Sequence, residues 1–106
     1  MSVWNRMWEI NEQFDYGEKM EDPQFWINMM RSQVDELEEA LENGDDEHLV
    51  REFVDCMLVG QKGIMESPNV MNSFQALAVT QHRIHNIEER IPDIMEKYEE
   101  DGHRRE

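Results

Sequence analysis

Four polar side chains interrupt two apolar stretches in the middle of the sequence. Gln33 and Glu36 fall within or beside the apolar stripe of one expected helix. Glu52 and Asp55 point into the nearly all-apolar surface of the next expected helix. The members of each pair are three residues apart, so they are neighbours on a helix surface. Because a buried carboxylate is costly unless it is paired or bound to a metal ion, these residues are the candidates for chemistry.

The chemistry that this set indicates is the binding of a divalent metal ion. Converging carboxylates repel one another unless a cation lies among them. Oxygen ligands without His or Cys suit Mg²⁺, with Mn²⁺ as the alternative. Magnesium also tends to keep water and to bind substrate phosphates, which favours phosphate chemistry. For Glu36 taken alone, the competing interpretation is that its carboxylate reaches solvent or pairs with an arginine.

The two pairs converge only if the helices that carry them lie side by side. Helix signals dominate the sequence, and no alternating strand pattern of useful length is present. An Asp-Pro pair at residues 22–23 starts the first of these helices, and an Asn-Gly pair at 43–44 ends it. The second helix begins at Asp45 or Asp46 and runs to about Met65. The short turn between them predicts adjacent antiparallel helices.

Three further helices are expected, over residues 2–14, 69–90 and 93–98, with a loop over residues 15–21. The predicted fold is therefore all-α, a compact helical bundle of four to five helices. Residues 1–98 are expected to form a single domain, and residues 99–106 a charged tail that frays. Because a chain of 106 residues buries only a thin core, we expect oligomerisation to complete the bundle.

The composition limits the classes of partner. The chain has 25 acidic and 10 basic residues, and its net charge of -15 argues against nucleic-acid binding. Surface solubility, adaptation to high salt or a Glu-rich helical composition would also explain the charge. The single cysteine, Cys56, lies in an apolar run and is interpreted as a buried structural thiol. Without a signal segment or a long apolar run, we expect a cytoplasmic protein with no membrane partner.

A family resemblance runs from Gln33 to Leu58. Gln33-x-x-Glu36 on one helix, a Gly-Asp turn and Glu52-x-x-Asp55 on the next resemble the MazG-like branch of the all-α nucleoside triphosphate pyrophosphohydrolases. That family pairs E-x-x-E with E-x-x-D. The resemblance implies a Mg²⁺-dependent enzyme, assembled as a homodimer or homotetramer. Its substrate would be a (deoxy)nucleoside triphosphate, cleaved to the monophosphate and pyrophosphate.

Carried over residue by residue, the resemblance makes Glu36, Glu52 and Asp55 metal ligands. Gln33 departs from the family, which has Glu at that position. Its amide oxygen can still bind a metal ion but carries no charge, which implies fewer metal ions, weaker affinity or a degenerate enzyme. The alternative register, Glu36 with Glu39, restores two carboxylates but places Glu39 on the solvated face. We prefer Gln33 with Glu36 and keep Glu39 as a candidate outer base, so the catalytic candidates are Glu36, Glu39, Glu52 and Asp55.

Substrate contacts are expected from two other parts of the chain. The spacing Arg83-x-x-Asn86-x-x-x-Arg90 resembles, off by one residue, a basic segment that some family members place before a Trp-Pro. These three residues are candidates for phosphate contacts, and ordinary surface or capping groups are the alternative. A base pocket would need aromatic side chains, which are also typical of a helical core. The aromatic candidates are Trp4, Trp8, Phe14, Phe25 and Trp26.

Two other functions fit the same residues. The first is a catalytically degenerate relative that binds metal or nucleotide without turnover, and it predicts no pyrophosphate release. The second is an acidic interaction protein, in which Glu52 and Asp55 would matter no more than Glu38 or Glu42. Under this second hypothesis, Asp55→Asn would leave metal binding unchanged.

Overall fold

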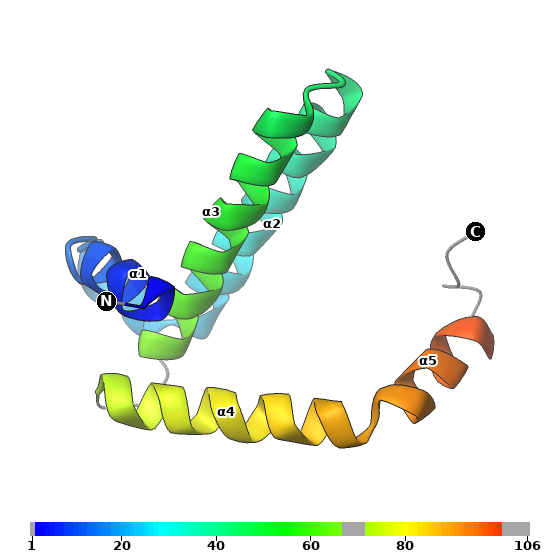
Figure 1. Ribbon diagram of the computed structural model, residues 1–106. Coiled ribbons are helices and arrows are strands. Elements are labelled where there is room, and N and C mark those ends of the chain that lie inside the picture. The colour runs from blue at the N-terminus through cyan, green and yellow to red at the C-terminus, as the bar shows by residue number, and fades with distance from the viewer. Residues whose placement is uncertain (1, 67–71, 101–106) are drawn as a thin grey trace. The chain divides into compact units, whose positions relative to one another are not determined.

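The computed structural model of the protein describes residues 2–66 and 72–100. Every regular element in these ranges is a helix, which confirms the predicted all-α class (Figure 1). In chain order the elements are α1 (Val3–Glu12), the 3-10 helix η1 (Gly17–Glu21), α2 (Pro23–Glu42), α3 (Asp46–Met65), α4 (Ser73–Glu89) and α5 (Ile91–Glu100). None of the helices in the described ranges has the length and apolar character that crossing a membrane requires.

Helices α2 and α3 run side by side as an antiparallel hairpin (Figure 1). The Asp22 side chain caps α2 by accepting a hydrogen bond from the Gln24 backbone N–H at 2.9 Å. Gly44 has a φ of +68°, the left-handed conformation that a tight turn after a helix needs. The Asp45 side chain caps α3 through the backbone N–H of His48 at 3.0 Å. The helices predicted on either side of this turn are confirmed nearly residue for residue.

Two glycines bring the open end of the hairpin together. A Cβ added at Gly60 would lie 3.8 Å from Met30 Cε, and one added at Gly63 would lie 3.7 Å from Trp26 Cβ. Side chains of α2 therefore pack directly on the backbone of α3 in this region. The indole N–H of Trp26 also donates to the carbonyl oxygen of Met20 at 3.0 Å. This bond ties α2 to η1, which forms inside the stretch that the sequence predicted as a loop.

Helix α1 contacts α3 and is held there by buried polar side chains. The Asn11 amide nitrogen Nδ2 donates to the Leu58 carbonyl oxygen at 3.0 Å and to Gln61 Oε1 at 2.9 Å. Gln61 in turn donates to the Trp4 carbonyl oxygen at 2.9 Å. Lys62 Nζ donates to the Asn11 carbonyl oxygen at 2.8 Å. We call these three residues the Asn11–Gln61–Lys62 network.

The hairpin leaves many apolar side chains exposed. Among the described residues of α2 and α3, only Trp26 and Ala40 are buried apolar residues. The exposed apolar side chains recur at helical spacing on both helices. They are Ile27, Val34 and Leu41 on α2, and Val50, Phe53, Val54 and Met57 on α3. Such a surface is consistent with the expected homo-oligomer, which stays a prediction.

The chain divides into two units, Met1–Ser73 and Phe74–Glu106. In the second unit, α5 begins before Pro92, whereas the sequence predicted a start just after it. Proline is tolerated there because the first N–H groups of a helix have no intrahelical partner. The predicted start of the preceding helix at residues 69–71 and the predicted tail beyond residue 100 lie outside the described residues. The single domain expected over residues 1–98 stays a prediction.

Candidate metal centre

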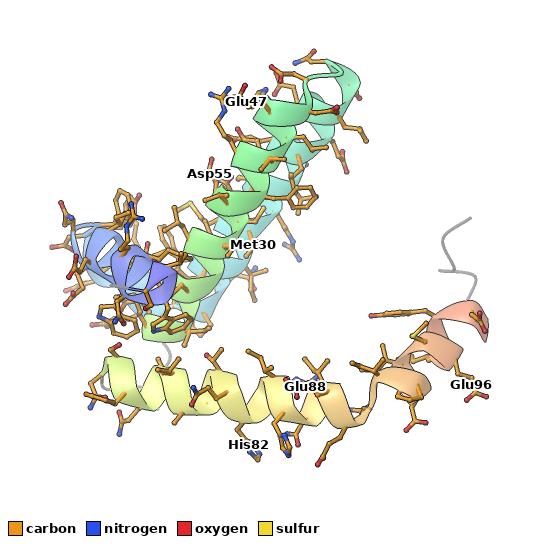
Figure 2. All side chains as sticks on the ribbon, viewed as in Figure 1. Met30, Glu47, Asp55, His82, Glu88 and Glu96 are labelled. Carbon is orange, nitrogen blue, oxygen red and sulfur yellow. The ribbon has the colours of Figure 1, made fainter. Side chains whose placement is uncertain are left out.

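The hairpin brings Glu36, Glu52 and Asp55 together. Each offers one carboxylate oxygen, and these oxygens lie within 4.8 Å of one another. Glu36 comes from α2, and the other two come from α3. Figure 2 shows Asp55 on the middle part of the hairpin, between Glu47 near the turn and Met30 toward the open end. We call these three residues the carboxylate cluster.

The cluster contains buried oxygen atoms that the chain itself does not satisfy. The Glu52 side chain is 12% exposed, and its Oε1 lies 3.1 Å from the His48 ring nitrogen Nε2. Its other oxygen, Oε2, is buried without a hydrogen-bond partner among the described residues, and so is Oε1 of Gln33. Buried oxygens normally have a donor or a cation as partner. The donor set therefore fits a hard divalent cation such as Mg²⁺.

Crowded negative charge raises the pKa of two cluster members. For Glu36, the largest causes of the raised pKa are the hydrogen bond to Glu52 that its carboxyl gains only when it takes up a proton, and the negative charge of Glu52. For Asp55, burial is the largest cause of the raised pKa, followed by the charge of Glu52. Burial and the negative charges of Asp55, Glu52 and Glu36 also raise the pKa of the Cys56 thiol, which makes it a poor nucleophile. Without a cation, the cluster therefore favours holding a proton.

Glu39 lies outside the carboxylate cluster. Its side chain is exposed on α2, as expected for the solvated face. Its negative charge still contributes, as the smallest cause, to the raised pKa of Glu36. Glu39 is therefore close enough to affect the cluster electrostatically, and its role as an outer base stays a prediction.

A cavity of about 180 Å³ adjoins the cluster. Asp55 forms part of its wall, so the cavity and the cluster share this residue, and Gln33 also lines the cavity. Most of the remaining wall is aromatic or aliphatic, and Tyr16 and Trp26 meet edge to face with ring centroids 6.3 Å apart. A mostly apolar wall with a few polar groups is typical of a ligand pocket. The other lining residues are Asn11, Phe14, Met29, Leu58, Val59 and Lys62.

Of the predicted substrate contacts, Phe14 and Trp26 line the cavity, whereas Trp8 and the three predicted phosphate contacts do not. The structure places the Trp8 ring beside Trp4, with centroids 6.3 Å apart, and Trp8 is not among the residues that line the cavity. Arg83 and Asn86 belong to α4 in the second unit, and Arg90 follows that helix. The backbone of Arg90 hydrogen-bonds on both sides of the junction between α4 and α5, as a capping residue does. A contact of these three residues with phosphate stays a prediction.

Sequence reasoning missed six residues of the cavity wall, and three of them carry polar groups, namely Asn11, Tyr16 and Lys62. Lys62 follows Asp55 by seven residues, which is two helical turns and places both on one face of α3. That spacing was a usable signal. Asn11 reaches the cavity through contacts that span 47 and 50 residues of sequence, for which no local signal exists.

Comparison with known proteins gives no match for this chain. No family model matches it, and no curated protein or solved structure is similar enough to count as a relative. The function of the site is therefore argued from its own geometry.

Proposed function

We propose that the protein is a Mg²⁺-dependent nucleoside triphosphate pyrophosphohydrolase. The observation that carries this proposal is the carboxylate cluster, in which three side chains from two helices converge within 4.8 Å. The buried oxygens of Glu52 and Gln33, which have no partner among the described residues, support it. An adjoining aromatic cavity gives a second compartment, for the base of a nucleotide.

The residues of the cluster have separate roles in this proposal. Glu36, Glu52 and Asp55 would hold the cation, and Gln33 would offer its amide oxygen as a neutral ligand. When bound, Mg²⁺ would neutralise charge on the phosphate oxygens and on the departing pyrophosphate. His48, whose ring nitrogen lies 3.1 Å from Glu52, would fix the orientation of that carboxylate.

The remaining residues would position the substrate and handle a proton. Phe14, Tyr16 and Trp26 would hold the base, which keeps the triphosphate beside the cluster. Water adds to the substrate as the bond between the α and β phosphates breaks, and pyrophosphate leaves. Glu39, exposed and close to Glu36, would accept the proton of that water.

Pyrophosphate release from a panel of ribonucleoside and deoxyribonucleoside triphosphates with Mg²⁺ tests this function. We expect Asp55→Asn to reduce release at least about 100-fold, because it removes a charged ligand. Asp35→Asn is the matched control, since Asp35 is exposed on α2 and outside the cluster. Equal activity of the two variants, or no release from any nucleotide, would refute the enzyme hypothesis.

Gln33 favours a second candidate function, a metal- or nucleotide-binding protein without turnover. Its amide brings no charge to the cluster and cannot accept a proton as a base. Saturable Mn²⁺ binding that Asp55→Asn abolishes, without pyrophosphate release, would establish this candidate. If Asp55→Asn and Asp35→Asn bind Mn²⁺ equally well, an acidic interaction protein becomes the better hypothesis.

A further inference from the structure

Lys62 is a buried lysine that belongs to the wall of the cavity. The residue is only 4% exposed. Its Nζ donates to the Asn11 carbonyl oxygen at 2.8 Å and lies 3.2 Å from Glu66 Oε1. Asp55, which belongs to the carboxylate cluster, lines the same cavity. The wall of the cavity therefore contains both Asp55, a candidate metal ligand, and Lys62, a hydrogen-bond donor.

The ammonium group of Lys62 has one more hydrogen than these contacts use. A lysine offers three N–H donors, and the two contacts with Asn11 and Glu66 occupy two of them. A buried donor without an acceptor is costly, so a ligand in the cavity that carries an acceptor would be favoured. Asn11 can supply an acceptor to the same ligand. Both hydrogens of its Nδ2 are used in hydrogen bonds to Leu58 and Gln61, and its amide oxygen remains as an acceptor.

The size and charge of the cavity limit what that ligand is. Its volume of about 180 Å³ lies below the roughly 300–1,000 Å³ of pockets for larger ligands, which suits one planar ring. Aromatic side chains in the wall suit stacking on such a ring. A phosphate is disfavoured beside Lys62, because Glu66 already pairs with its ammonium group and the carboxylate residue Asp55 lines the same cavity.

We propose that Lys62 is a specificity residue that donates a hydrogen bond to a ring carbonyl oxygen of a pyrimidine base in the cavity. Asn11 would accept a hydrogen bond from the same base. The inference deepens the proposed function and rests on it for the phosphate half of the substrate. The selected substrates are pyrimidine nucleoside triphosphates, because a purine needs room for a second ring.

Isothermal titration of the wild type and Lys62→Met tests this inference. The probes are α,β-methylene analogues of pyrimidine and purine nucleoside triphosphates, and inorganic tripolyphosphate, each with Mg²⁺. We expect the wild type to prefer the pyrimidine analogues. Lys62→Met should weaken their binding about 10- to 100-fold, the usual effect of losing a charged hydrogen bond, and change tripolyphosphate binding less than about 2-fold.

Three outcomes would overturn the role of Lys62. They are equal weakening of pyrimidine analogues and tripolyphosphate, no weakening of either, and a wild-type preference for purines. If the wild type does not bind tripolyphosphate, the proposed function fails instead. In that case, NMR titration with free pyrimidine nucleosides tests whether the cavity binds the base. Chemical-shift changes at cavity residues that Lys62→Met removes would support the inference. The absence of such changes would overturn it.

Folding of the variants is controlled separately. Lys62 also holds the end of α1 through the Asn11 carbonyl, so Lys62→Met could unfold the protein. The double variant with Glu66→Met replaces both charges with apolar groups, which avoids an unpaired carboxylate. It should show the same selective loss of pyrimidine binding. Glu66→Gln is the control that keeps the ammonium group, and its pyrimidine affinity should stay within about 3-fold of the wild type.

Discussion

Helix α3 carries two groups of polar side chains, and they differ in how their polar atoms are satisfied. In the second half of the helix, Gln61 and Lys62 donate to carbonyl oxygens of α1, and Gln61 also accepts from Asn11. In the first half, Glu52 keeps a buried oxygen without a partner among the described residues. There the pKa of Asp55 is raised by burial and, to a lesser extent, by the negative charge of Glu52.

The two groups of polar side chains on α3 therefore serve different purposes: one stabilises the fold and the other is suited to binding a cation. The Asn11–Gln61–Lys62 network satisfies most of its groups inside the protein, so it contributes to the free energy of folding. The carboxylate cluster needs a cation from solution to balance its charge, so it contributes favourable free energy when that cation binds. Removing a polar group should therefore destabilise the metal-free protein when the group belongs to the network, and stabilise it when the group is a carboxylate of the cluster.

The largest effect on stability is expected for Asn11→Ala. The change removes two hydrogen bonds, to the Leu58 carbonyl oxygen and to Gln61 Oε1, and leaves the buried Gln61 oxygen without this donor. We expect a loss of about 2–4 kcal/mol in the free energy of unfolding, measured by urea titration. Asn5→Ala is the control, since Asn5 is exposed on the same helix and should cost less than about 0.5 kcal/mol. Equal losses would mean that the network does not stabilise the fold.

A smaller effect on stability is expected for Gln33→Glu, which adds a negative charge beside the cluster. A fourth carboxylate would strengthen Mn²⁺ binding about 10-fold, because affinity rises with the number of charged ligands. The same charge would destabilise the metal-free protein by repulsion with the cluster. Calorimetric titration with Mn²⁺ and thermal unfolding in EDTA measure both effects. Gln24→Glu makes the same charge change at an exposed position of α2. It should change neither the Mn²⁺ affinity nor the stability of the metal-free protein. Unchanged Mn²⁺ affinity would exclude Gln33 from the site.

The smallest expected effect is on the pH dependence of the metal-free protein. The pKa values of Glu36 and Asp55 are raised above their ordinary 4.5 and 3.8, so the folded state binds protons more tightly than the unfolded state. The resulting stabilisation is fully present below those ordinary values and is lost as pH rises through the raised ones. We therefore expect the Tm in EDTA to fall as pH rises from mildly acidic to neutral.

Two variants separate this effect from the general acidity of the chain. Glu52→Gln removes the charge that helps to raise both pKa values, so its Tm should depend less on pH. Glu47→Gln removes a charge whose side chain is 84% exposed and should keep the slope of the wild type. Mg²⁺ should also flatten the slope, by replacing the protons. If the Tm of both variants depends on pH as steeply as that of the wild type, the cluster is not the source of the pH dependence.

Much of the hairpin was predictable because its signals are local. The Asp-Pro start, the Asn-Gly stop and the Asp cap each act within a few residues, and the helices begin and end close to them. The convergence of Glu36 with Glu52 and Asp55 follows from the same signals. Helical spacing fixes which side chains share a face, and a short turn makes the two faces adjacent.

The rest of the site depends on contacts that no local pattern specifies. Tyr16 reaches the cavity from a stretch that was predicted as a loop. Trp8 has the same side-chain chemistry as Trp26, yet only Trp26 lines the cavity. Trp8 lies on α1, whose direction on the hairpin is set by hydrogen bonds between distant residues, whereas Trp26 belongs to the hairpin itself.

The turn at Gly44 has a consequence for the order of events during folding. All the proposed ligands lie between residues 33 and 55, so closing one short turn is enough to gather them. The hydrogen bonds that fix α1 span 47 to 57 residues, and such distant contacts form later. We therefore expect the carboxylates to capture a cation on a half-folded chain, so that Mg²⁺ accelerates refolding in stopped-flow experiments. A purely slower unfolding rate in Mg²⁺ would show that the hairpin forms late.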